Sequence, residues 1–162
     1  HLQLGENARA AERLEAIVAR DPANVSAWSQ LQSIYLAQAA ETKDEDEARA
    51  QNLRALHVLE RAQPLGHLAT PRDHYTRVAI LFNLRQYARA AAALETGLAD
   101  ATLENSRRNW ELLASAYQQL GQDARAIDAL TRAAARFPAD GALDFALAQL
   151  LYATGQIEPA YQ

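Results

Sequence analysis

The chain has no cysteine and no methionine, and glycine (6) and proline (5) are scarce among its 162 residues. Without cysteine, the chain has neither disulfides nor thiolate chemistry. The shortage of turn-forming residues argues against an all-β fold with many tight turns. A net charge of −4 gives no support for nucleic-acid binding. No apolar run approaches the length of a membrane span, so we expect no direct membrane insertion.

Alanine (37) and leucine (23) dominate the composition, and both are strong helix formers. Hydrophobic residues make up 49% of the chain and charged residues 22%, which is typical of a globular protein rather than a disordered one. The composition therefore predicts an all-α fold. Because the chain starts at His1 and lacks methionine, we expect it to be a fragment of a longer chain.

A spaced pattern of apolar and small residues recurs along the chain. It is clearest after Trp110, where it continues through Leu113, Ala114, Tyr117, Gly121, Ala126, Leu130, Ala133 and Pro138. It begins again at Asp144, with Leu147, Ala148, Leu151, Gly155 and Ala160 at matching offsets. The first three apolar offsets lie on one helix face, and the alanines let two antiparallel helices approach closely. The pattern predicts helix pairs that stack on one another.

Earlier repeats are less regular. Trp28, Leu31 and Tyr35 start one repeat, but the displacement of Pro64 indicates about eight inserted residues near the acidic stretch at 40–47. Tyr75 lies near the start of another repeat, and the chain begins with half a repeat that ends at Pro22. We predict helices over residues 7–20, 25–39, 46–62, 72–84, 87–98, 106–119, 123–136, 141–153 and 157–161, and no sheet. Thr70 and Ser106 are expected to cap two of these helices.

The pattern W-x2-L-A-x2-Y, followed by A-x3-L and by proline, resembles the tetratricopeptide repeat. The period of that repeat, about 34 residues, is also the interval from Trp110 to Asp144. The resemblance implies an all-α, right-handed helical-repeat solenoid of antiparallel helix pairs, with about four repeats. We expect a single domain over residues 1–162, with an acidic insertion at 40–47 in the second repeat.

Motifs for catalysis and for cofactor binding are missing, so we expect neither enzyme activity nor a cofactor. His67 and His74 are a weak candidate metal pair, and the alternative is two solvated histidines in a connection. The five carboxylates of residues 41–47 lack the spacing of a calcium loop, which favours a solvated loop leading into an acidic helix start. Arg107 and Arg108 beside Trp110 could suggest base stacking, but a packing role for Trp110 is favoured.

The resemblance implies that a ligand lies along the inner, concave faces of the first helices of the repeats. An extended or helical peptide of another protein fits such a surface. The residues that face or border this surface are largely polar and end in two aromatics: Ser29, Ser33, Thr76, Arg77, Asn83, Arg108, Glu111, Ser115, Gln118, Phe145, Gln149 and Tyr152. The alternative is that they are ordinary solvent-facing residues.

One subclass of the family binds the C-terminal carboxylate of chaperones through a clamp of lysine, asparagine and arginine side chains. The matching positions here include Ser29, Ser33 and Arg77, and the clamp is absent. The stretch from Asn109 to Ala160 is also similar to bacterial envelope proteins that accompany TonB-type systems. The cytoplasm and the bacterial periplasm both stay open as locations.

The sequence thus predicts a protein–protein interaction scaffold that binds a partner on its concave face. Two alternatives stay open. One is a self-assembling structural module, and the other is the interaction domain of a larger enzyme whose catalytic part lies outside this chain.

Overall fold

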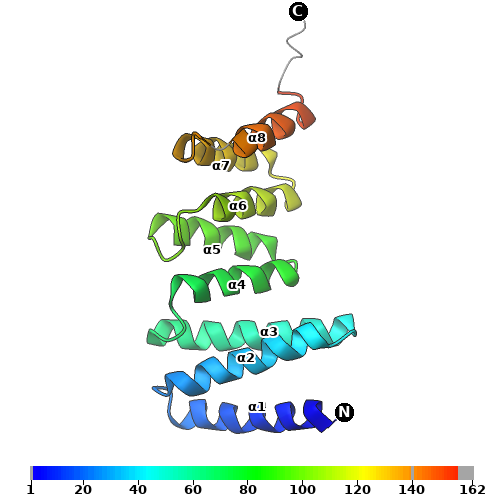
Figure 1. The fold of residues 1–162 in the computed structure, drawn as a ribbon, viewed down its shortest axis with the longest axis vertical. Coiled ribbons are helices and arrows are strands. Elements are labelled where there is room, and N and C mark those ends of the chain that lie inside the picture. The colour runs from blue at the N-terminus through cyan, green and yellow to red at the C-terminus, as the bar shows by residue number, and fades with distance from the viewer. Residues whose placement is uncertain (1, 140, 157–162) are drawn as a thin grey trace, which may run out of the picture. The chain divides into compact units, whose positions relative to one another are not determined.

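The computed structural model describes the backbone of residues 2–139 and 141–156, and their side chains from residue 5 onward. Within these ranges the chain forms eight α-helices and one short 3-10 helix, without any strand (Figure 1). The all-α helical-repeat prediction is therefore confirmed. The helix predicted at 157–161 lies outside the described residues.

The helices divide between two compact units, residues His1–Arg85 and Gln86–Gln162. Unit 1 contains α1 (Leu2–Arg20), α2 (Val25–Glu41), α3 (Glu45–Ala62), the 3-10 helix η1 (Gln63–Leu65) and α4 (Pro71–Asn83). Unit 2 contains α5 (Tyr87–Ala99), α6 (Arg107–Gln119), α7 (Asp123–Arg136) and α8 (Gly141–Ala153). Inside each unit, every α-helix packs against the next one along the chain.

The helix starts follow from their capping residues. Thr70 and Asp73 form a reciprocal capping box at the start of α4, with Pro71 as its first residue. The hydroxyl of Ser106 accepts a hydrogen bond from the Asn109 amide at the start of α6. Both predicted caps are confirmed. Asp44, which accepts hydrogen bonds from two amides at the start of α3, is a further cap.

Glycine ends α6 and α8 in the same way. Gly121 has φ of 67°, in the left-handed region that glycine adopts without strain, and the Gln122 amide donates to the Tyr117 carbonyl at 2.9 Å. Gly155 repeats this with φ of 70° and a 2.9 Å bond from the Gln156 amide to the Leu151 carbonyl. The glycine of the repeat pattern therefore closes the turn that follows the first helix of its repeat.

Large aromatics and small alanines share the helix interfaces, as the sequence predicts. Trp28 and Trp110 are each 2% exposed, and Tyr117 is 3% exposed. Ala114 on α6 and Ala126 on the adjacent α7 are buried as well. Because an alanine side chain ends at its Cβ, these positions let the two helix backbones pack closely.

The irregular second repeat has longer helices rather than a long loop. Ala55 is the buried residue of α3 that corresponds to Ala126 of α7. More residues separate Trp28 from Ala55 than separate Trp110 from Ala126, and the excess is larger than the insertion of about eight residues that the sequence predicts. Most of the insertion extends helices, because α2 runs to Glu41, α3 begins at Glu45, and only residues 42–44 connect them. The acidic residues that begin α3 form its first turn, where carboxylates favour the helix dipole.

Replacing Ala126 with leucine should overpack the contact between α6 and α7. We expect the free energy of unfolding to fall by about 1–3 kcal/mol, because the closely packed helices have no room for the added carbons. Denaturant unfolding followed by circular dichroism measures this change. Ala135→Leu, at an exposed position of the same helix, is the matched control and should stay within about 0.5 kcal/mol of the wild type. Equal stability of both variants would contradict close packing of α6 and α7 at Ala126.

Candidate functional site

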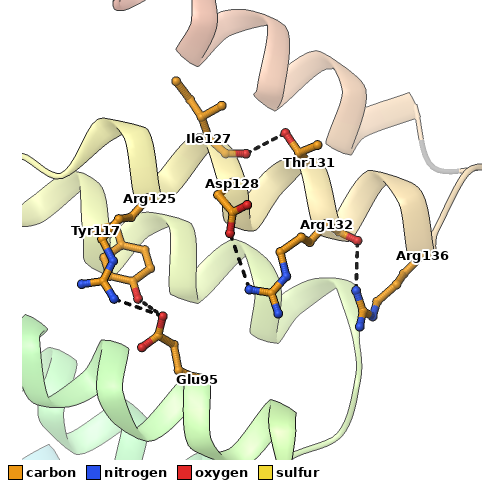
Figure 2. Close-up of polar contacts among 8 residues, drawn as sticks. All are labelled: Glu95, Tyr117, Arg125, Ile127, Asp128, Thr131, Arg132 and Arg136. Atoms are coloured by element: carbon orange, nitrogen blue, oxygen red, sulfur yellow. Dashed lines mark hydrogen bonds and ion pairs between the residues drawn. The ribbon is translucent and has the colours of Figure 1, made fainter.

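A tyrosine, a glutamate and an arginine connect three helices of unit 2 (Figure 2). The Tyr117 hydroxyl on α6 donates a hydrogen bond to the Glu95 carboxylate on α5. On α7, the Arg125 guanidinium lies 4.5 Å from the centre of the Tyr117 ring and 3.4 Å from a Glu95 oxygen. The arginine thus combines a cation–π contact with an ion pair, and we call this set the Tyr117 cluster.

Two further arginines of α7 cover Trp110. The guanidinium carbons of Arg132 and Arg136 lie 5.0 Å and 4.9 Å from the centre of its ring, and Arg132 also pairs with Asp128 at 3.5 Å. The indole N–H of Trp110 donates to Asn105 at 2.7 Å. With its ring packed and its donor bonded, Trp110 has the packing role that the sequence indicates and is not placed to stack on a base.

Unit 1 repeats this arrangement with a different ion pair. Glu15 on α1 forms a 2.8 Å ion pair with Arg61 on α3 and accepts a 3.4 Å hydrogen bond from the Tyr35 hydroxyl on α2. The Arg61 guanidinium lies 4.9 Å from the centre of the Trp28 ring. The sequence analysis missed these contacts. Their signal is a pair of arginines seven residues apart on each second helix, beside the buried stripes that begin at Ala55 and Ala126: Arg54 and Arg61 in unit 1, and Arg125 and Arg132 in unit 2.

The Tyr117 cluster also changes an acid–base property. Burial of the hydroxyl, the hydrogen bond to Glu95 and the charge of Glu95 together raise the pKa of Tyr117 from 10.0 to about 12, against a smaller lowering by Arg125 and Arg132. Burial is also the largest cause that raises the pKa of Tyr35, followed by the charge of Glu15. Both phenols are therefore held in the neutral, hydrogen-bonding form.

A hollow of about 330 Å³ lies between α6, α7 and α8 of unit 2. Its walls combine polar side chains of α6 and α8 with small and branched apolar ones: Glu111, Ala114, Gln118, Leu130, Ala146, Gln149, Leu150 and Ala153. Three of the predicted concave-face residues, Glu111, Gln118 and Gln149, therefore line one hollow. We call it the α6–α8 hollow.

Two exposed aromatics share α8 with this hollow. Phe145 is 63% exposed and Tyr152 is 71% exposed, the highest values among the exposed large apolar residues of the described chain. Phe145, Gln149 and Tyr152 are four and three residues apart, which places them along one stripe of the helix. Because Gln149 lines the hollow, the aromatics lie on the same stripe as part of its wall.

The other predicted residues have more ordinary surroundings. Ser33 and Thr76 each donate to a backbone carbonyl one turn back, at 2.9 Å. Arg77 is half-buried and lies 4.0 Å from Glu60, and Asn83 donates to Asn52 at 3.4 Å. Ser29 and Arg108 are exposed, and Ser115 is half-buried. Because Arg108 is exposed whereas Arg77 is half-buried, Arg108 is the better candidate for a cation that meets a ligand.

The described residues hold no group of three metal-ligating side chains, and His67 and His74 are both half-buried. Over the same ranges, no helix is long and apolar enough to cross a membrane.

Comparison with known proteins places the fold. Residues 107–151 match the family model described as tetratricopeptide repeat. A thermophilic TPR protein of Thermus thermophilus has 26% sequence identity and a TM-score of 0.59, over 93% of this chain and 76% of that one. The crystal structure of MamA has 17% identity and a TM-score of 0.62, over 93% of this chain and 80% of that one. Among curated proteins, none matches significantly.

The family match covers the stretch that contains α6, α7 and most of α8, and the two solved structures share the helical-repeat fold of the chain. Proteins of this fold are generally non-enzymatic scaffolds that bind other proteins. The comparisons do not support the similarity to TonB-associated envelope proteins.

Replacing Tyr117 with phenylalanine should remove the phenol whose pKa is raised to about 12. Because the folded protein holds the proton more tightly than the unfolded chain, this contribution to stability is complete below pH 10 and is lost as the pH rises toward about 12. Phenolate absorbance during alkaline titration measures the midpoint, and Tyr117→Phe should lack the component near 12. The matched variant Glu95→Gln removes the negative charge beside the phenol, so the pKa of Tyr117 should move down toward 10. A wild-type Tyr117 that titrates near 10 would contradict the cluster.

Proposed function

We propose that this chain is a protein–protein interaction module and that the α6–α8 hollow, with Phe145 and Tyr152 beside it, binds a peptide or helix of a partner protein. One observation carries the proposal: a hollow with polar and apolar walls lies on the same helix as the two most exposed aromatics of the described chain. Aromatic and arginine side chains are the ones that most often dominate binding energy at interfaces.

The chemistry of the hollow indicates what the partner carries. Its apolar part, which includes Leu130 and Ala146, fits a large apolar side chain, and the two exposed aromatics add apolar surface beside it. Gln118 and Gln149 supply amide groups that can bond to an extended or helical backbone. In the first turn of α6, the exposed Arg108 offers a positive charge to an acidic residue of the partner. We infer a partner segment with one large apolar and one acidic residue.

The same exposed aromatics favour a second candidate, self-assembly, in which a second copy of the chain covers α8. Light scattering over a range of protein concentrations separates the two. A mass that stays monomeric supports the binding of another protein. A mass that rises with concentration in the wild type, but not in Phe145→Ala, assigns this surface to a second copy.

Peptides selected from a random display library on the whole chain should reveal the recognised chemistry. We expect the enriched peptides to combine a large apolar residue with an acidic one. Phe145→Ala, Tyr152→Ala and the charge reversal Arg108→Glu should each weaken binding of a selected peptide about tenfold or more, roughly 1.4 kcal/mol, in a fluorescence titration. Circular dichroism should show unchanged helicity in all three.

Leu120→Ala is the matched control, because Leu120 is a partly exposed apolar residue beyond the end of α6 and does not line the hollow. It should leave the affinity unchanged. If the three site variants bind as tightly as the wild type, the binding surface lies elsewhere on the chain.

A further inference from the structure

A second and larger hollow lies within unit 1, between α1, α2 and α3. Its volume is about 970 Å³, at the upper end of the roughly 300–1,000 Å³ typical of ligand clefts. It extends along the parts of α2 and α3 that the insertion lengthens, from Tyr35 to Thr42 and from Glu47 to Arg54. None of the predicted concave-face residues lines it. We call it the α1–α3 hollow.

The lining of this hollow is strongly acidic. Glu12, Glu15, Glu41 and Glu47 contribute four carboxylates, and Arg54 is the single basic residue among the lining residues. Glu15 is paired with Arg61, but no ion pair within the described residues neutralises Glu12 or Glu41. A surface that combines unpaired carboxylates with a partly enclosed volume concentrates negative potential, and it attracts cations.

A buried amide adds a specific acceptor to this charge. Gln51 on α3 lines the hollow and is only 3% exposed. Its Nε2 donates to Glu47, but its Oε1 accepts no hydrogen bond from any described residue. A buried carbonyl oxygen without a partner is unusual in a folded protein. Among the residues that line the hollow, Gln51 therefore carries an acceptor that no described donor satisfies.

Unit 2 shows which group occupies the equivalent place. There, Arg125 on α7 stacks 4.5 Å from the Tyr117 ring centre and pairs with Glu95, and the remaining hollow beside them is about 210 Å³. The equivalent Arg54 of unit 1 lies 6.0 Å from the Tyr35 ring centre. Glu15, the counterpart of Glu95, pairs with Arg61 instead. Arg54 thus lies farther from its ring than Arg125 does, and the Glu15 carboxylate is paired with another arginine.

We propose that the α1–α3 hollow binds an arginine side chain of a partner peptide. A guanidinium matches it in two respects. Its charge complements Glu12 and Glu41, and its several N–H donors can bond to carboxylates and to the Gln51 carbonyl together. The apolar part of the lining, Ala8 and Ala11 on α1, suits the methylene stem of the side chain. This site lies in unit 1 and recognises basic segments, so it is independent of the α6–α8 hollow.

The probe is a short fluorescent peptide in which arginine alternates with glycine, titrated against the whole chain by anisotropy at physiological ionic strength. Its matched control has citrulline in place of arginine, which keeps the shape and removes the charge. We expect saturable binding of the arginine peptide and at least about tenfold weaker binding of the citrulline peptide. A lysine version tests for guanidinium geometry and should bind more weakly than the arginine version. Equal binding of the arginine and citrulline peptides, or no binding of either, would overturn the proposal.

Matched double variants locate the site. Glu12→Gln with Glu41→Gln removes two lining carboxylates and should weaken arginine-peptide binding about tenfold or more. Glu6→Gln with Glu45→Gln removes the same charge from exposed positions on α1 and α3 that do not line the hollow, and it should leave the affinity nearly unchanged. Equal weakening by both pairs would mean attraction to the overall charge of the chain, and the site would be rejected.

Gln51→Leu separates recognition from folding. Because the Gln51 carbonyl has no partner within the described chain, and the exposed Glu47 carboxylate that accepts from Nε2 can bond to water instead, an apolar side chain of similar size should change the melting temperature little. It should nevertheless weaken arginine-peptide binding severalfold. Unchanged affinity in a folded Gln51→Leu variant would contradict the role of this acceptor.

Discussion

Close packing of the antiparallel helices α6 and α7 at small alanine side chains is the constraint on which the core of unit 2 depends. Ala114 and Ala126 are buried where α6 meets α7, and Ala55, the counterpart of Ala126, is buried in α3. Because these side chains are small, the larger rings of Trp110 and Tyr117 can fill the space at other levels of the same interface. The α6–α7 interface thus combines small and large buried side chains.

A second interaction connects three helices in each unit. A glutamate on one helix receives a tyrosine hydroxyl from the next and an arginine from the third: Glu95, Tyr117 and Arg125 in unit 2, and Glu15, Tyr35 and Arg61 in unit 1. The two sets use arginines from different turns of the second helix. The hollows beside the two sets also differ in size. The one in unit 1, where the helices are longer, has about 970 Å³, and the one in unit 2 has about 210 Å³.

Local features of the fold were predictable because local residues determine them. The period of apolar residues and the caps at Thr70 and Ser106 placed most helix bounds close to those of the structure, and the burial of Trp28 and Trp110 followed from the repeat register. The main exceptions are α1, which starts at Leu2 rather than near residue 7, and the length of the insertion. The displaced proline misled the prediction of that length, because α2 and α3 both extend beyond the repeat pattern.

Features that depend on side chains from three helices could not be predicted from local sequence patterns. The repeat spacing placed Glu111, Gln118 and Gln149 on one predicted surface, and the structure puts them around one hollow, but their role in binding stays a prediction. The α1–α3 hollow depends on how α1 and α3 both lie against α2, and no sequence offset records this. The arginines that cover the buried rings recur at matching positions of the sequence. Their role as ring contacts is seen only once the structure places the rings.

Hydrogen–deuterium exchange of the whole chain, with and without a peptide selected by display, tests the interaction account most directly. The account predicts that the bound peptide slows exchange in α6 and α8, residues 107–119 and 141–153, and leaves α1 to α3 unchanged. Slower exchange confined to helices outside α6 and α8, or no slowing at a saturating peptide concentration, would contradict the α6–α8 hollow as the binding site for a partner protein.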